Sequence, residues 1–327
     1  PKAAYAQLRK MHREAEEAFS CTGMLENIPE NIAKISDLAG LSDNDRAILT
    51  FVVFIHSDSI LDDTADMLDK ISSGKMYHVL AILLDLPEQD IRASLAAKGL
   101  LANTGLVVLA HESGRLSEKL KVLSSSFADS ILHSDADPVT LLRDIVVPSR
   151  AATLRFEDFE HVSPALTVLL LYLRHAIAVR RQGVNILLHG VPGTGKSELS
   201  RLLAMELDCE LFEVASEDDG GDPVESHSRF QAFRAAQSFF IHRRTLILFD
   251  EIEDVFRDGD SPTHFLRRNS QAHSRKAWVN RILEGNPVPT IWVSNSVACL
   301  DQAYARRFDM VIEMPVPPQR QRERIVR

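Results

Sequence analysis

The feature that most limits how this chain can fold is a glycine-rich octapeptide, Gly-Val-Pro-Gly-Thr-Gly-Lys-Ser, at positions 190–197. It follows an apolar run, Asn185 to Leu188, that predicts a strand, and it precedes a helical pattern. Between a strand and a helix, such glycines let backbone N–H groups surround a phosphate, and the helix N-terminus adds its positive end. The predicted phosphate-binding residues are Gly190, Val191, Pro192, Gly193, Thr194, Gly195, Lys196 and Ser197.

Two residues of the octapeptide have side chains with a chemical task. Lys196 is expected to reach the β- and γ-phosphates of a nucleotide, and the Ser197 hydroxyl is expected to bind Mg²⁺. A glycine-rich turn without a ligand is the alternative, and the strand and helix on the required sides argue against it. The octapeptide therefore predicts a site for a nucleoside triphosphate with magnesium.

Two acidic residues end a second apolar strand. The run Leu246 to Phe249 leads into Asp250 and Glu251. Ligand chemistry belongs at the carboxyl edge of a parallel sheet, so we expect Asp250 to support magnesium and Glu251 to orient the attacking water. An exposed acidic strand end is the alternative. Glu253 and Asp254 continue the acids, and we interpret them as partners of a helix N-terminal dipole rather than as catalysts.

Short apolar runs alternate with helical patterns through the second half of the chain. This rhythm predicts an α/β core, a five-stranded parallel sheet between helices, of the P-loop nucleotide-hydrolase type. The predicted strands are Asn185–Leu188, Glu210–Val214, Thr245–Phe249, Thr290–Val293 and Met310–Glu313. All five fall in the second half of the chain.

Polar residues after the fourth strand and before the fifth complete a known pattern. Ser294 and Asn295 close the fourth strand, and Arg-Arg-Phe-Asp occupies positions 306–309. Together with the octapeptide (Walker A) and the acids (Walker B), these residues resemble the AAA family of ATPases, in a bacterial-type form, from about position 156 to the end. The resemblance implies ATP and Mg²⁺ as cofactors and ATP hydrolysis as the activity.

The resemblance also implies roles for three further side chains. Asn295 matches the sensor residue that links the attacking water to the γ-phosphate. Arg306 and Arg307 match the arginine fingers, which act on the ATP of the adjacent subunit in a ring that is a hexamer in the family. A cation supplied across an interface stabilises charge on the γ-phosphoryl oxygens. Either arginine alone could instead be a surface cation. The family's base-binding groups correspond to Phe159–Val162, where His161 could also be a cap or surface residue.

Two departures from the family pattern concern the pore and the lid. The loop Ser216–Pro223 lacks the aromatic residue with which protein-threading members grip substrate, so threading by that grip is not expected. This acidic loop either contacts a basic partner or is only solvated. The helical lid would begin near Pro318. Because the chain opens at Pro1 without Met and stops at Arg327 inside a helical pattern, we expect a fragment with a truncated lid.

The first 145 residues are predicted to form a mainly α-helical domain. Within it, two helical runs separated by a proline and followed by a short apolar run predict a winged-helix-like unit at about 74–133. Positions 146–160 are interpreted as a linker, with Pro148 among mixed apolar and charged residues. Positions 161–327 are then the AAA large subdomain.

The charge of the chain bears on the choice among three possible functions. Residues 1–150 hold 15 Lys and Arg against 22 Asp and Glu, and the chain has a net charge of −9. Nucleic acids attract clustered cations, so a protein partner is favoured over DNA. The leading hypothesis is an ATP-driven ring that remodels a macromolecular partner. The alternatives are a DNA-associated ATPase and a nucleotide-switch adaptor with little turnover.

Cysteine usage and hydropathy bound the compartment. Cys21, Cys209 and Cys299 are far apart and lack metal-ligand spacing, which indicates free thiols in a reducing compartment and a cytoplasmic location. Apolar stretches such as 165–173 are shorter than the roughly 20 residues of a membrane span, so no membrane contact is expected.

Overall fold

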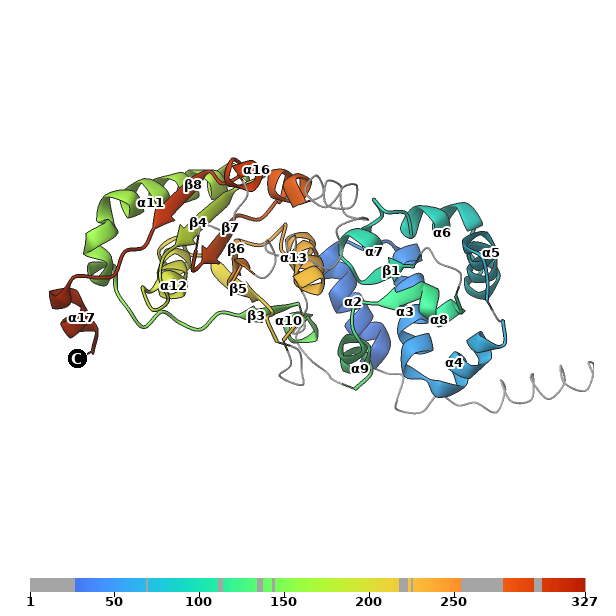
Figure 1. The fold of residues 1–327 in the computed structure, drawn as a ribbon. Coiled ribbons are helices and arrows are strands. Elements are labelled where there is room, and N and C mark those ends of the chain that lie inside the picture. Colours follow the sequence, from blue (N-terminus) through green and yellow to red (C-terminus); the bar gives the residue numbers. More distant parts are fainter. Residues whose placement is uncertain are drawn as a thin grey trace, which may run out of the picture.

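The computed structural model describes nine stretches of the chain. They are residues 27–68, 70–110, 114–133, 138–142, 145–217, 223–224, 226–253, 279–296 and 302–326. A helical front half packs beside an α/β half, and Figure 1 shows the two side by side along the long axis of the molecule. This order confirms the predicted helical region followed by an α/β core.

The front half consists of helices around one small hairpin. The helices are α2 (Asn27–Ala39), α3 (Asp43–Ser57), α4 (Ser59–Asp66), α5 (Ser73–Leu84), α6 (Glu88–Ser94), α7 (Leu100–Asn103), α8 (Leu116–Lys119), α9 (Ser125–His133) and α10 (Pro138–Leu141). Strands β1 (Val107–Leu109) and β2 (Leu120–Val122) pair antiparallel. Helices α5 and α6 and this hairpin fall inside the range predicted for a winged-helix-like unit, which stays a prediction.

Helix α3 lies at the centre of the front half, and its sequence provides both an N-terminal cap and an apolar face that is buried. The Ser42 side chain accepts from the Asp45 backbone, and the Asp45 side chain accepts from the Ser42 backbone, which forms a capping box. Ile48, Val52 and the residues between them on the same face are fully buried. Predicted cap and predicted core face therefore coincide in one helix.

The α/β half has a six-stranded sheet in the order β3-β5-β6-β7-β4-β8. Its strands are β3 (Val146–Pro148), β4 (Asn185–His189), β5 (Glu210–Val214), β6 (Thr245–Phe249), β7 (Thr290–Ser294) and β8 (Met310–Glu313). Its named helices are η1 (Phe156–Val162), α11 (Ser163–Ala178), α12 (Lys196–Glu206), α13 (Ser226–Phe239), α16 (Gln302–Ala305) and α17 (Gln319–Val326). The five predicted strands are parallel to one another, as expected.

The sixth strand corrects the predicted linker at 146–160. Val146–Pro148 pairs antiparallel with β5, with Val146 opposite Val214. The proline that suggested a linker is tolerated because β3 is an edge strand with only one neighbour. The later part of the same stretch is the 3₁₀-helix η1. The segment thus consists of an edge strand, a short connecting segment and a 3₁₀-helix.

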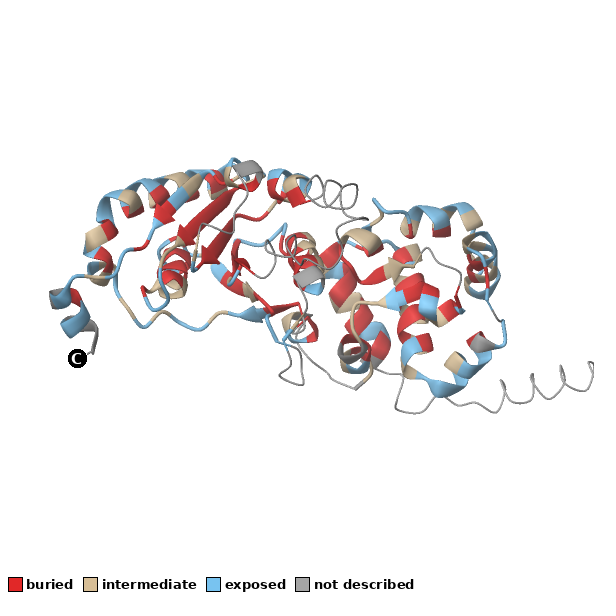
Figure 2. Cartoon of the chain, viewed as in Figure 1, coloured by how far each residue is buried: buried red, intermediate tan, exposed pale blue. Residues whose placement is uncertain are grey.

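Apolar residues cover both faces of the sheet and extend to the front half. On one face, alternate strand residues such as Leu188 and Leu248 pack in a cluster with α11 and α12. On the other face, Ile247, Phe249 and Trp292 belong to a cluster that runs through α13 into the front helices. Helix α13 packs against α2 and α7. Figure 2 shows the buried strands and the buried inner sides of these helices in red.

One helical run has an apolar outer side as well. By length and composition, Phe156–Ala178 is sufficient to cross a membrane. Its Leu169 and Leu173 are fully buried in the cluster on the sheet, whereas Val168 and Leu171 are exposed. A helix that covers one face of a sheet explains the buried side. The absence of membrane contact stays a prediction.

Candidate active site

The glycine-rich loop joins β4 to α12 at the carboxyl edge of the sheet. Gly190 has a φ of +152°, and a Cβ there would overlap the carbonyl oxygen of Met314. Gly195 has a φ of +85°, and a Cβ there would lie 3.0 Å from the Phe159 ring. Both positions therefore require glycine, because a side chain would strain the backbone and meet a neighbour at once.

Lys196 connects the loop to the end of β7. Its buried Nζ donates to the carbonyl oxygens of Gly190 at 2.7 Å and Val191 at 3.1 Å, and to Asn295 Oδ1 at 3.0 Å. Burial lowers the pKa of Lys196, and the negative charges of Asp250 and Glu253 oppose this shift. The predicted lysine and the predicted sensor residue thus lie in direct contact.

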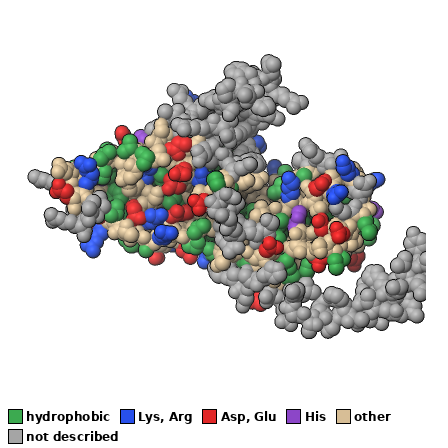
Figure 3. Space-filling view, turned by 60° about the horizontal axis from the view of Figure 1, so that its bottom comes forward, with side chains coloured by type: hydrophobic (Ala, Val, Ile, Leu, Met, Phe, Trp, Pro, Cys, Tyr) green, Lys and Arg blue, Asp and Glu red, His purple; other side chains and the backbone are tan. Residues whose placement is uncertain are grey.

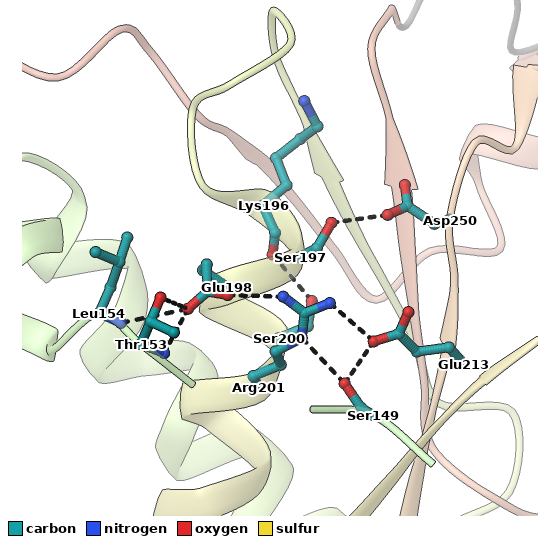
Figure 4. Close-up of polar contacts among 10 residues, drawn as sticks. All are labelled: Ser149, Thr153, Leu154, Lys196, Ser197, Glu198, Ser200, Arg201, Glu213 and Asp250. Atoms are coloured by element: carbon teal, nitrogen blue, oxygen red, sulfur yellow. Dashed lines mark hydrogen bonds and ion pairs between the residues drawn. The ribbon is translucent and has the colours of Figure 1, made fainter. Parts of the chain in front are cut away.

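Ser197 and Asp250 form the second contact across this edge. The Ser197 hydroxyl in the first turn of α12 donates to Asp250 Oδ2 after β6 at 2.7 Å, as Figure 4 shows. Hydroxyl and carboxylate oxygens suit Mg²⁺, which usually takes one or two protein ligands together with phosphates and water. Among the described residues, no cluster of three or more His, Cys, Asp or Glu could hold a metal. Two such ligands fit a cation that arrives with a nucleotide.

Glu251 directly follows Asp250 at the same carboxyl edge of the sheet. Its side chain is exposed, its φ is +54°, and its backbone N–H donates to Asp250 Oδ1 at 2.8 Å. A left-handed conformation is uncommon for a residue with a Cβ and persists where the surroundings hold it. The corner formed by Asp250 and Glu251 is therefore a held turn rather than a loose strand end.

Glu253 has a role that the sequence interpretation missed. Its buried Oε1 accepts from the Ser294 hydroxyl at 2.8 Å, from the Ser296 N–H at 3.1 Å and from the Asn295 N–H. The reading of Glu253 as a helix-dipole partner was therefore incomplete, because its carboxylate fixes the turn that carries Asn295. Closely spaced serines around Asn295 were the available signal. Asp254 lies outside the described residues.

Arg306 and Arg307 lie at the opposite, amino edge of the sheet. The Asn185 side chain at the start of β4 donates to the Arg307 carbonyl at 3.4 Å, whereas the phosphate loop follows the end of β4. Four steps along a strand, at about 3.3 Å each, amount to roughly 13 Å. Arg306 is exposed, and Arg307 forms an ion pair with Glu284 at 2.6 Å. The structure does not bring these arginines to the loop of their own chain.

A polar network holds the segment that connects β3 to η1. Glu198 on α12 accepts from the Thr153 N–H at 2.8 Å, and Arg201 donates to Glu198 at 2.7 Å and to Glu213 on β5 at 3.0 Å (Figure 4). Arg201 also donates to Ser149 at 3.1 Å. These contacts tie the segment before η1 to the helix that carries Lys196 and Ser197.

The region expected to hold the base contains polar atoms without a partner. Phe159 of η1 packs against Gly195, and His161 stacks near Phe159 with a centroid separation of 6.5 Å. Both ring nitrogens of His161 are buried and have no hydrogen-bond partner among the described residues. The same holds for Gln321 Oε1 on α17, which packs against η1. Buried polar atoms of this kind are unfavourable unless a ligand or water pairs them.

Most of the predicted acidic loop lies outside the described part of the chain. Within the acidic loop 216–223, positions 218–222 lie outside the described residues. The absent aromatic is therefore a statement about sequence alone.

The fold and loop define a P-loop α/β protein of the nucleotide-binding class. Residues 186–316 match the family model described as "ATPase family associated with various cellular activities (AAA)". The chain therefore carries an AAA ATPase domain. This confirms the predicted family resemblance over residues 186–316.

Individual relatives are similar over parts of their length. A "Mitochondrial sorting homolog" of Caenorhabditis elegans is 28% identical over 144 residues, 43% of this chain and 41% of the relative. The "26S proteasome regulatory subunit 8 homolog B" of Arabidopsis thaliana is 25% identical over 209 residues, 59% of this chain and 48% of the relative. The chain thus spans less than half the length of these relatives. The crystal structure of the FIGL-1 AAA domain in complex with ADP has 20% identity and a TM-score of 0.39, covering 59% of this chain and 66% of that one.

Proposed function

We propose that this chain binds ATP with Mg²⁺ and hydrolyses it in a ring of subunits, and that the ring remodels a macromolecular partner. The observation that carries the proposal is the convergence at one sheet edge. Lys196 contacts Asn295 at 3.0 Å, and Ser197 contacts Asp250 at 2.7 Å. Four residues from three separate segments meet at the end of the phosphate loop.

Each residue at this edge has a task in phosphoryl transfer. The loop and Lys196 bind the β- and γ-phosphates, and Ser197 with Asp250 holds the cation. Mg²⁺, when bound, supplies positive charge against the phosphate oxygens. Glu251 orients the attacking water and accepts its proton, and Asn295 holds that water against the γ-phosphate. Asn295 also contacts Lys196, so Asn295 is linked to the γ-phosphate through the lysine that binds it.

The unpaired polar atoms beside η1 support a purine base as the remaining part of the ligand. A base that lies between η1 and α17 offers both donors and acceptors at its edge. His161 would pair with a ring nitrogen, and Gln321 Oε1 would accept from an exocyclic amine. An exocyclic amine of adenine satisfies that acceptor, which fits ATP. A metal-only or phosphate-only ligand would not supply partners for these atoms.

The arginines at the amino edge support an assembly in which sites are completed between chains. Neither Arg306 nor Arg307 lies beside the loop of its own chain, so a second chain must present them if they act on ATP. We propose that they act in trans on the neighbour's γ-phosphate, in a hexameric ring. Exposure of Arg306 leaves it accessible to such a neighbour.

A protein partner is favoured over DNA by the charge of the molecule. The face in Figure 3 shows acidic and basic described side chains interspersed, without a broad basic area over that face. Residues 1–150 carry more acids than bases. Duplex DNA would instead need clustered cations. A relative named as a proteasome regulatory subunit is in keeping with a protein partner. The isolated cysteines support a cytoplasmic setting.

The deciding experiment measures the ATP hydrolysis rate per subunit over a wide range of protein concentration. A rate that rises with concentration supports sites completed between chains. A flat rate would place complete sites within one chain and overturn the ring. No turnover despite tight ATP binding would make the protein a nucleotide switch. Stimulation by duplex DNA, lost as salt is raised, would identify the partner as DNA.

A further inference from the structure

Helix α13 places a buried arginine behind the corner that follows β6. Arg229 is only 3% exposed. Its Nη2 donates to the Asp250 carbonyl oxygen at 2.6 Å, and its Nη1 donates to the Glu251 carbonyl oxygen at 3.3 Å. Its guanidinium also lies over the Phe249 ring, 4.7 Å from the centroid. Three successive residues of the Walker B segment therefore contact one side chain.

These contacts replace the sheet ladder at the point where it stops. The pairing of β6 with β7 ends at Phe249 opposite Trp292, so the next two carbonyls leave the ladder. A guanidinium is planar and presents its donors as a rigid fork, which suits two neighbouring acceptors. With both carbonyls held, the chain turns through Glu251 in its left-handed conformation. The Asp250 carboxylate is thereby directed to Ser197.

We propose that Arg229 is a positioning residue for hydrolysis. It sets the backbone of Asp250 and Glu251, and it acts on the reaction through those two residues. The inference rests on the proposed function, because a positioning role has meaning only if this corner works on ATP.

The helix that carries Arg229 also contacts the front half. Further along the same helix, Arg234 donates to Asn103 of α7 at 3.2 Å, beside a cavity of about 290 Å³ between α13 and the front half. Helix α13 also packs against α2. Arg229 in the first turn of α13 holds the corner after β6, and Arg234, five residues further along the helix, contacts the front half.

The test compares Arg229 with an arginine that makes the same kind of contact elsewhere. Arg244 donates from Nε and Nη2 to the Leu207 carbonyl oxygen, at 3.2 and 2.8 Å, away from the site. The variants are Arg229→Met, Arg229→Lys and Arg244→Met in the full chain. For each, kcat and KM for ATP hydrolysis, ATP affinity and thermal unfolding are measured.

A positioning role predicts a loss in kcat that ATP affinity does not share. Arg229→Met should lower kcat roughly 10- to 100-fold, because a misplaced catalytic group costs rate steeply. ATP affinity should change by less than about threefold, since Lys196 and the loop are untouched. Arg229→Lys keeps the charge but reaches one carbonyl, so it should fall between wild type and Arg229→Met. Arg244→Met should keep kcat within about twofold.

Other outcomes would overturn the inference in distinguishable ways. Unchanged kcat in Arg229→Met, with only a lower unfolding temperature, would make Arg229 a structural residue. If Arg229→Met does not fold, unchanged kcat in Arg229→Lys would lead to the same conclusion. A wild-type chain that binds ATP without turnover would instead overturn the proposed function, and that result appears before any variant is compared.

Discussion

The two edges of the sheet differ in what one chain can complete. At the carboxyl edge, the loop, Ser197, Asp250 and Asn295 meet within hydrogen-bonding distances. At the amino edge, Arg306 is exposed and Arg307 is paired with Glu284. The first edge brings the predicted phosphate and magnesium residues together, and the second lies at the other end of the strands from the phosphate loop. Under the proposed function, one chain provides the ATP-binding edge and its neighbour provides the arginines.

The largest expected effect belongs to the amino edge. Arg306→Ala should lower kcat on the order of 10³-fold, because an arginine finger stabilises charge that exists only in the transition state. ATP affinity should change little. The measurement is steady-state ATP hydrolysis beside nucleotide binding, with Arg174→Ala as control, since Arg174 is a surface cation paired with Glu206 at 3.5 Å.

A mixing experiment sharpens the same comparison. Lys196→Ala lacks the carboxyl-edge lysine but keeps its arginines, and Arg306→Ala has the reverse defect. If the arginine acts across an interface, a mixture should recover part of the rate that neither variant has alone. No recovery at any ratio would mean either that Arg306 acts within its own chain or that it takes no part in hydrolysis.

The next effect breaks the carboxyl edge itself. Lys196→Ala should weaken ATP binding on the order of 10²-fold or more, because it removes a buried cation from the phosphates. Binding of a fluorescent ATP analogue measures this, and Lys75→Ala on the exposed surface of α5 is the matched control. Unaltered affinity would mean that the phosphates bind elsewhere.

Glu251→Gln separates binding from turnover at that edge. The amide keeps the shape but accepts no proton, so kcat should fall about 10²-fold while ATP remains bound. ATP trapped on the protein after a single turnover, beside steady-state rates, reports both. Glu157→Gln on η1 provides the control. Normal turnover would reassign the residue that activates water.

The parts of this site that lie next to a sequence motif could be predicted from the local sequence. The octapeptide and the acids after Phe249 could be placed because a strand end and its following residues are adjacent in sequence. The cap at Ser42 and the buried face of α3 were predictable for the same reason. Each depends on periodicity or turn chemistry within a few residues.

Contacts distant in sequence could not be predicted in this way. Glu253 reaches a turn 42 positions away, and Arg229 reaches a carbonyl 21 positions away. Which backbone atoms need a partner depends on where β6 and β7 stop pairing, and no local pattern encodes that. Strand β3 was missed because Val-Val-Pro is short, and its proline is acceptable only once the strand is known to lie at an edge.

Glu253 therefore offers a test of the hidden support at the carboxyl edge. Glu253→Ala removes the carboxylate that accepts from the Ser294 hydroxyl and from the N–H groups of Asn295 and Ser296, so Asn295 should shift and kcat should fall about tenfold. Glu253→Gln keeps an acceptor oxygen and should lose less. The unfolding temperature of both variants is measured in parallel. Equal rates in Glu253→Ala and wild type would contradict the positioning of Asn295 by this carboxylate.

The smallest expected effect concerns the base rather than the phosphates. His161→Phe keeps a ring beside Phe159 but removes two buried nitrogens that have no partner among the described residues. If one of them pairs with the base, its loss should weaken ATP binding about fivefold, the net contribution of roughly one hydrogen bond. ATP and GTP affinities are compared by displacement of a fluorescent nucleotide, with His175→Phe on the exposed side of α11 as control. A lost preference for ATP over GTP would tie His161 to base recognition. Unchanged affinities would move the base away from η1 and leave the carboxyl edge responsible for the phosphates alone.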